Sequence, residues 1–179
     1  MNSSENPEIP SQLDDWTWDT VITIVKKHEF EPGIFDYKDA LHPTGDQKYR
    51  DAHTDSVRRT VCSMANTSGG FILFGVLDHK KSASKPEERL KGISVKEDLR
   101  KEFGDKIAPL QPDVYFDATL LRSPDDSSKG IFVVHIPHSL RRPHMISSNG
   151  AYYRRGEGGQ AQLMNHYEVR EQEVGPGYV

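Results

Sequence analysis

Apolar residues recur every three or four positions in three segments of the chain, which is the spacing of a helix face. The segments are residues 14–27, 54–66 and about 99–110. The first follows Asp14 and Asp15, either of which can cap a helix, although its β-branched residues also allow a strand. The second has Asp55 as a candidate cap and ends at Gly69-Gly70, where glycine permits the positive φ that terminates a helix.

Strand patterns fill much of the remaining chain. Residues 34–40 alternate between two faces, and residues 71–77 are apolar on both faces, as in a central strand covered on two sides. Residues 114–121 and 130–137 flank a turn-rich connector and predict a hairpin. Further strands are expected at residues 90–95 and 151–155. Together these elements predict an α+β fold with a mixed, mainly antiparallel sheet and two to three packed helices.

The composition fits one soluble globular domain, since 179 residues with 35% hydrophobic and 28% charged residues can bury a core. We assign the domain to residues 14–165, with a disordered leader at residues 1–13 and a tail or linker at residues 166–179. The single cysteine, Cys62, allows neither an intrachain disulfide nor a cysteine-based zinc site, which favours a reducing cytoplasm. No apolar stretch approaches the roughly 18 residues of a membrane span, so no membrane partner is expected.

The formal net charge of -4 argues against a polybasic nucleic-acid binder. Four basic pairs nevertheless occur, and folding could gather them into a local groove. The alternative is that each pair is solvated surface. The pairs are Arg58-Arg59, Lys80-Lys81, Arg141-Arg142 and Arg154-Arg155.

Three carboxylates and a lysine are the strongest candidates for chemistry. Asp36 and Lys38 share one face of the first predicted strand, and a proline–glycine turn can bring Glu31 to the same side. Asp78 marks the end of the buried central strand. Carboxylates hold hard divalent cations and a lysine neutralises phosphate, so the set predicts a metal-assisted phosphodiester reaction. Acids and lysines also alternate on exposed strand faces of unrelated proteins, which is the competing interpretation.

Other chemistries have weaker support. No glycine-rich segment matches the nucleoside-triphosphate loop, so ATP is not expected as a ligand. None of the eight histidines has metal-site spacing, and His79 is the one candidate for an accessory ligand or proton shuttle. Cys62 is expected in the core rather than as a nucleophile. Four aromatic residues could stack on bases, although core packing is their more frequent role. They are Trp16, Trp18, Tyr152 and Tyr153.

Longer stretches of the chain resemble one family, the Schlafen core, also called the AlbA-like DNA-binding domain. The stretches are residues 31, 36–38, 61–78, 142–144 and 151–156, within a resemblance that covers about residues 14–160. Its most specific part is the helix exit Ala65-Asn66-Thr67-Ser68-Gly69-Gly70, which runs into a strand ending in Gly75-Val76-Leu77-Asp78. The resemblance implies a single Schlafen-like lobe.

Members of this family pair acidic residues before and within the first strand with an aspartate after the glycine-rich strand, and some cut tRNA or rRNA with a divalent metal. The resemblance therefore implies that Glu31, Asp36 and Asp78 hold Mg²⁺ or Mn²⁺ and that Lys38 faces the phosphate. Asp36 stands where the family usually has glutamate, which is longer by one methylene.

The resemblance implies a nucleic-acid-binding domain that acts as a metal-dependent endoribonuclease on structured RNA such as tRNA. The alternative is a non-catalytic RNA- or DNA-binding module with a regulatory or defence role. Nuclease members commonly carry two lobes, so a homodimer or a second domain is expected to complete the groove here. Six arginines are expected to contact the nucleic acid, namely Arg58, Arg59, Arg141, Arg142, Arg154 and Arg155.

Overall fold

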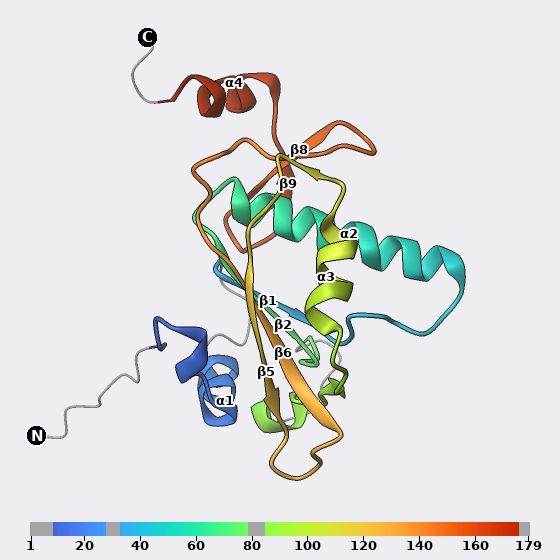
Figure 1. The fold of residues 1–179 in the computed structure, drawn as a ribbon. Helices are drawn as coiled ribbons and strands as arrows, with labels where there is room; N and C mark the ends of the chain where they lie inside the picture. Colours follow the sequence, from blue (N-terminus) through green and yellow to red (C-terminus); the bar gives the residue numbers. More distant parts are fainter. Residues whose placement is uncertain (1–8, 28–32, 79–84, 176–179) are drawn as a thin grey trace, which may run out of the picture.

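The computed structural model describes residues 9–27, 33–78 and 85–175 (Figure 1). Within these ranges the helices are α1 (Trp18–Lys27), α2 (Gln47–Ala65), α3 (Leu99–Ile107) and α4 (His166–Val174), with short 3-10 helices η1 (Leu13–Asp15) and η3 (Pro86–Arg89). The fold is α+β, as the sequence predicts. None of these helices is long and apolar enough to cross a membrane.

The strands of the first sheet are β1 (Phe35–Lys38), β2 (Gly70–Phe74), β3 (Ile93–Ser94), β5 (Asp117–Arg122) and β6 (Lys129–Ile136). β1 runs parallel to β2, and β6 is antiparallel to β2, β3 and β5, so this sheet is mixed. β5 and β6 form the predicted hairpin. β2 is central, as predicted, because β1 and β6 pair with its two edges.

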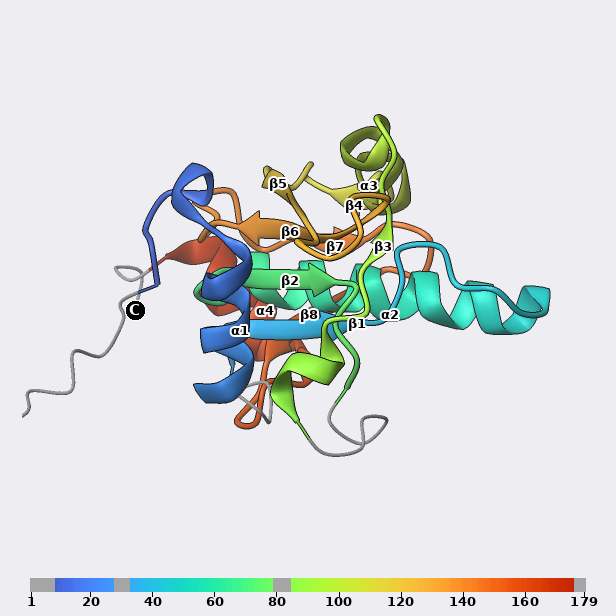
Figure 2. The same ribbon diagram turned by 90° about the horizontal axis from the view of Figure 1, so that it is seen from below.

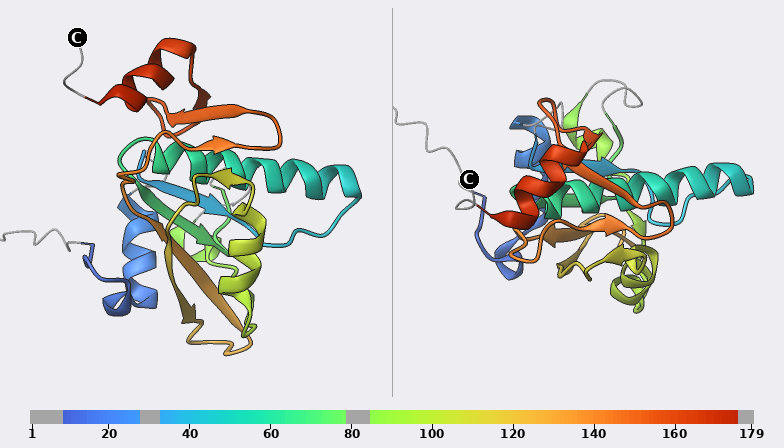
Figure 3. Two further views of the ribbon diagram at one scale, coloured as in Figure 1. Left: turned by 45° about the horizontal axis from the view of Figure 1, so that its top comes forward. Right: turned by 90° about the horizontal axis from the view of Figure 1, so that it is seen from above.

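The strands of the second sheet are β4 (Leu110–Gln111), β7 (Met145–Ile146), β8 (Ala151–Arg155) and β9 (Ala161–Leu163). All of its pairings are antiparallel. The sequence does not show that the strands divide between two sheets. The physical reason lies in α2, where every residue from Thr60 to Ala65 is buried. A helix end that is buried all round needs cover on opposite sides, and α2 lies between the first sheet and the β8–β9 hairpin (Figure 3).

Two hydrophobic cores lie on opposite faces of the first sheet. Ile72 and Phe74 of β2 pack toward α2 and α3, whereas Leu73 packs toward α1, as the period of two in a strand requires. Val21 of α1 is fully buried in the second core. This burial explains why residues 18–27 form a helix and not the alternative strand, since their apolar stripe covers one face of the sheet.

Three helix boundaries differ from the predicted ones. α1 begins at Trp18, and Asp14 and Asp15 lie in the preceding η1 rather than at its cap. α2 begins at Gln47, because the side chain of Asp46 caps it by accepting from the Tyr49 N–H at 2.8 Å, and Asp55 lies inside the helix. Its polar first half projects past the sheet into solvent and therefore carries no apolar periodicity (Figure 2). α3 ends at Ile107, and Leu110 belongs to β4.

The predicted tail, residues 166–179, contains α4, which begins with a reciprocal capping box between Asn165 and Glu168. Residues 1–8 of the predicted leader and the basic pair Lys80-Lys81 lie outside the described residues.

Candidate nucleic-acid interface

Asp36 and Lys38 lie on the same face of β1, as predicted, and this face is covered by α2. The Lys38 ammonium nitrogen lies 3.1 Å from each carboxylate oxygen of Asp36. The Thr60 hydroxyl of α2 donates to Asp36 Oδ2 at 2.6 Å. Asp36 is only 6% exposed. Both of its oxygens are therefore occupied by protein donors, and the Thr60 hydrogen bond joins β1 to α2.

The described residues do not by themselves fit a divalent metal. A metal at Asp36 would meet the Lys38 ammonium at ion-pair distance, and like charges repel. No group of three His, Cys, Asp or Glu side chains in the described ranges is arranged to hold a metal ion. Asp78 is partly buried beyond the end of β2, and Glu31 and His79 lie outside the described residues. The three-carboxylate site stays a prediction.

Four basic side chains from distant parts of the chain gather beside Asp36, and we call Lys38, His53, Arg58 and Lys106 the α2–α3 basic cluster. Arg58 Nε donates to the Lys106 carbonyl at 2.8 Å, and Lys106 Nζ lies 3.1 Å from the Thr54 hydroxyl. These bonds fasten α2 to the end of α3. The pKa of Lys106 is lowered, first by burial and then by the nearby Arg58 charge.

His53 lies close enough to Lys106 and Lys38 to be affected by both of their charges. Burial lowers the pKa of His53, and the charges of Lys106 and Lys38 lower it further. Both ring nitrogens are shielded from solvent and make no hydrogen bond of normal geometry within the described residues, although the Ala40 backbone and Asp39 partly oppose the shift. His53 is therefore favoured in its neutral form, between Lys106 and Lys38, the second of which is paired with Asp36.

The six arginines predicted to contact nucleic acid have different surroundings, and their role stays a prediction. Arg58 belongs to the basic cluster, and Arg59 Nε donates to the Asp55 carbonyl one helical turn earlier. Arg154 pairs with Glu168 of α4. Arg155 donates to the Gly33 and Phe35 carbonyls at 3.0 Å each, so its guanidinium covers the open edge of β1. Arg141 and Arg142 are exposed after β6.

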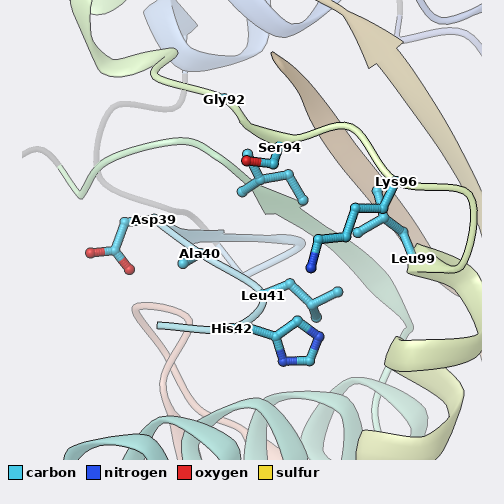
Figure 4. Close-up of a pocket in the computed structure, with 9 residues that line it drawn as sticks. Asp39, Ala40, Leu41, His42, Gly92, Ser94, Lys96 and Leu99 are labelled. Carbon is cyan, nitrogen blue, oxygen red and sulfur yellow. The ribbon is translucent and has the colours of Figure 1, made fainter. Parts of the chain in front are cut away.

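A pocket of about 290 Å³ opens where β1 ends (Figure 4). One wall is residues 39–42, which follow β1, and the other runs from Gly92 to Leu99. The walls come close because Gly75 and Gly92, with φ of 98° and 71°, touch backbone to backbone, and a Cβ at Gly75 would lie 2.8 Å from Gly92 Cα. The Gly92 N–H donates to the Gly75 carbonyl at 2.9 Å.

Asn66 and His144 join α2 to the second sheet. The Asn66 amide accepts from the His144 N–H at 2.6 Å and donates to the carbonyls of His144 and Tyr153 at 2.9 Å each. His144 Nδ1 donates to the Pro112 carbonyl at 2.6 Å, because that oxygen can only accept, and Nε2 then accepts from the Ser139 hydroxyl at 2.6 Å. Burial lowers the pKa of His144, consistent with this neutral tautomer.

Core packing accounts for two residues considered for chemistry. Cys62 is fully buried, and burial raises the pKa of its thiol to about 11, which confirms a core residue rather than a nucleophile. Trp16 is 4% exposed, and its ring lies 4.9 Å from that of Phe71. Its indole N–H donates to the Pro10 carbonyl at 3.0 Å.

Three residues at this site, Thr60, His53 and Lys106, were not expected there from the sequence. A signal for the first two exists in the spacing of His53, Val57 and Thr60, which places them on one face of a helix that starts before residue 53. No sequence pattern connects Lys106 with them, because its position depends on how α3 packs.

Comparisons with known proteins agree with this architecture. The family model described as Schlafen, AlbA_2 matches residues 31–164. The crystal structure of the DIP2311 protein from Corynebacterium diphtheriae aligns with a TM-score of 0.52 and 17% identity, over 87% of this chain and 28% of that chain. At that identity the likeness concerns the fold alone, and this chain spans just over a quarter of the length of its structural relative. No curated protein matches the sequence.

Proposed function

The chain belongs to the Schlafen AlbA_2 family, which implies a function related to nucleic acids, and from this premise we propose that it binds nucleic acid through the α2–α3 basic cluster. The observation that carries the proposal is the convergence of four basic side chains from β1, α2 and α3 in a chain whose formal charge is -4.

Phosphate is the ligand that this arrangement favours. Lys106 and Arg58 are partly buried, so each has lost part of its hydration. Lys106 contacts the neutral Thr54 hydroxyl, whereas Arg58 contacts the Lys106 carbonyl and lies 4.0 Å from the exposed Asp55 carboxylate. A phosphate oxygen would supply a charged acceptor, whose hydrogen bonds are about twice as strong as neutral ones. The net negative charge elsewhere does not prevent this, because a local field within about 10 Å dominates at moderate salt.

Cleavage of RNA with Mg²⁺ or Mn²⁺ at Glu31, Asp36 and Asp78 is a separate and second proposal. The family resemblance supports it, whereas the contacts of Asp36 with Lys38 and Thr60 support a structural role for this carboxylate. We also propose that a second copy or a further domain completes the binding surface.

The binding proposal is tested by fluorescence anisotropy with tRNA and with single-stranded DNA at several salt concentrations. Replacing Lys106 with alanine is expected to weaken binding and to reduce the slope of log K against log salt by about 1, since one phosphate contact is lost. Lys101→Ala is the matched control, because Lys101 is exposed on the same helix and pairs with Asp105. Equal affinities and slopes for the wild type and Lys106→Ala would contradict the proposed surface.

Cleavage is tested in the same samples with Mn²⁺ added. The metal proposal expects RNA fragments from the wild type and none from Asp78→Asn, which keeps the shape of the side chain and removes its charge. Equal cleavage by both proteins would exclude the assigned acidic site, and no cleavage by either would leave the binding proposal as the function.

A further inference from the structure

The pocket at the end of β1 presents a cation to open space. We propose that it binds a phosphate monoester, carried either by the end of a nucleic-acid strand or by a single nucleotide. In its strand-end form the inference rests on the proposed function. The pocket adjoins the basic cluster, because Asp39 in its wall directly follows Lys38 and its charge reaches His53.

Lys96 supplies the positive charge. Its side chain extends from the wall between β3 and α3 toward the His42 ring on the opposite wall (Figure 4). No hydrogen bond or ion pair holds this ammonium group within the described part of the chain. A phosphate monoester carries nearly two negative charges near neutral pH, against one for an internal phosphodiester. Lys96 therefore distinguishes a phosphorylated end from the rest of a strand.

His42 is held in a fixed orientation across the pocket. Its Nε2 lies 2.7 Å from Glu102 Oε2 of α3, and Nδ1 can donate to a phosphate oxygen only when both ring nitrogens carry a proton. A carboxylate that accepts from one ring nitrogen orients the other nitrogen toward a ligand. The same helix thus holds the His42 ring and begins at Leu99 in the pocket wall.

Asp39 is the acidic residue of the pocket and would oppose an anion that it faced. In Figure 4 its carboxylate points away from both Lys96 and His42. Ser94 lies on the same wall as Lys96 and is exposed, but its hydroxyl points away from Lys96 in Figure 4. The phosphate is therefore expected between Lys96 and His42, at the end of the pocket that Asp39 does not face.

The size and lining of the pocket limit the ligand to about one nucleotide. Its volume of about 290 Å³ is near the lower end of the roughly 300–1,000 Å³ found for small-molecule sites. Leu41 and Leu99 line the pocket but are almost fully buried, so they offer a ribose or base little apolar surface. An oligonucleotide would have to leave the pocket after its terminal residue.

The first arm of the test uses a short single-stranded RNA with a 5′-phosphate, a 3′-phosphate or only hydroxyl ends, measured by anisotropy. The wild type is expected to bind one phosphorylated form roughly tenfold more tightly than the hydroxyl form, which corresponds to one charge-assisted contact. Lys96→Ala should lose this preference and keep its affinity for the hydroxyl form. Lys101→Ala, whose ammonium is bound to Asp105, should behave as the wild type.

The second arm titrates nucleoside monophosphates and the matching nucleosides into the wild type and Lys96→Ala, followed by backbone NMR shifts at residues 39–42 and 92–99. Shifts that require the phosphate and Lys96 support the pocket even if RNA does not bind, in which case only the proposed function fails. If RNA binds without any preference for a phosphorylated end and monophosphates cause no shifts, the pocket proposal is wrong. The proposed function would still hold in that case. If neither RNA nor monophosphates bind, both the proposed function and the pocket proposal are wrong.

Discussion

Asp36 shows how a residue that matches a catalytic pattern can serve the fold. Its carboxylate is buried, and it accepts from the Thr60 hydroxyl while it neutralises Lys38, whose side chain is 15% exposed. Removing one partner of a buried pair leaves the other charge uncompensated, which costs more than the pair contributes.

We therefore expect Asp36→Ala to reduce the free energy of unfolding by about 3 kcal/mol, measured by urea denaturation. Thr60→Val should cost about 1 kcal/mol, because it removes one hydrogen bond and keeps the volume of the side chain. The double variant Asp36→Ala with Lys38→Met should be more stable than Asp36→Ala alone, since it contains no unpaired ammonium. An Asp36→Ala protein as stable as the wild type would show that this carboxylate is not structural.

For single residues, sequence prediction reaches only as far as local backbone geometry. That Asp36 and Lys38 share a face follows from strand alternation and could be predicted. Thr60 is 24 positions away from Asp36, and its contact depends on how α2 packs on β1. Lys96 and His42 meet for the same kind of reason, since two loops come together at the close approach of Gly75 and Gly92.

Among the elements, the exit of α2 has the strictest steric requirement. Gly69 has φ of 77°, and a Cβ there would overlap the Ile136 carbonyl oxygen and lie 2.8 Å from the His138 nitrogen. Gly150 has a similar φ of 68°, with no atom within 4 Å of an added Cβ. Comparing alanine substitutions at these two glycines therefore separates the free-energy cost of a left-handed backbone from the cost of steric overlap.

Gly150→Ala is expected to cost about 1 kcal/mol for the left-handed backbone alone. Gly69→Ala should cost about 3 kcal/mol, because the same strain is joined by overlap with a neighbouring strand that cannot move freely. Thermal or urea unfolding of both variants measures the difference. Equal losses would mean that β6 yields to the added methyl group and that the junction is less rigid than its contacts imply.

The beginning of α2 supports a prediction about its cap. The Asp46 side chain caps the helix at the Tyr49 N–H, whereas Asp51 accepts only from Gln47 on the exposed surface. Asp46→Ala should therefore destabilise the protein by about 1 kcal/mol, and Asp51→Ala by much less. Far-ultraviolet circular dichroism combined with urea unfolding would detect both effects. A larger effect at Asp51 would contradict the assigned cap.

The sequence predicts most of the helices and strands, but it does not predict the residues at which they begin and end. The apolar positions of α2 from Val57 onward predict a helix, but its first turns face solvent and carry no such pattern. The division of the strands into two sheets could not be inferred from the sequence for a related reason. Strand patterns indicate which faces are buried, whereas the choice of partner for β7, β8 and β9 depends on the far side of α2.

For the whole molecule, stability should depend on pH through three partly or fully buried histidines. Burial is the main cause that lowers the pKa of His53, His135 and His144. Each is therefore harder to protonate in the folded state than in the unfolded state, where the value is about 6.5. As the pH falls through 6.5, the unfolded state takes up protons that the folded state resists, so stability decreases until the folded pKa values are reached.

We expect the free energy of unfolding to be highest above about pH 7 and to fall between about pH 7 and pH 5. Carboxylates with lowered pKa values, such as Asp117, add a further loss only at lower pH, so the window isolates the histidines. His135→Phe should make the slope shallower, since His135 stacks on Phe71 at 4.6 Å and an apolar ring can take its place. Urea unfolding at several pH values measures both slopes. A wild-type stability that stays constant from pH 8 to pH 5 would contradict the burial of neutral histidines, and with it the arrangement of His53 between Lys38 and Lys106.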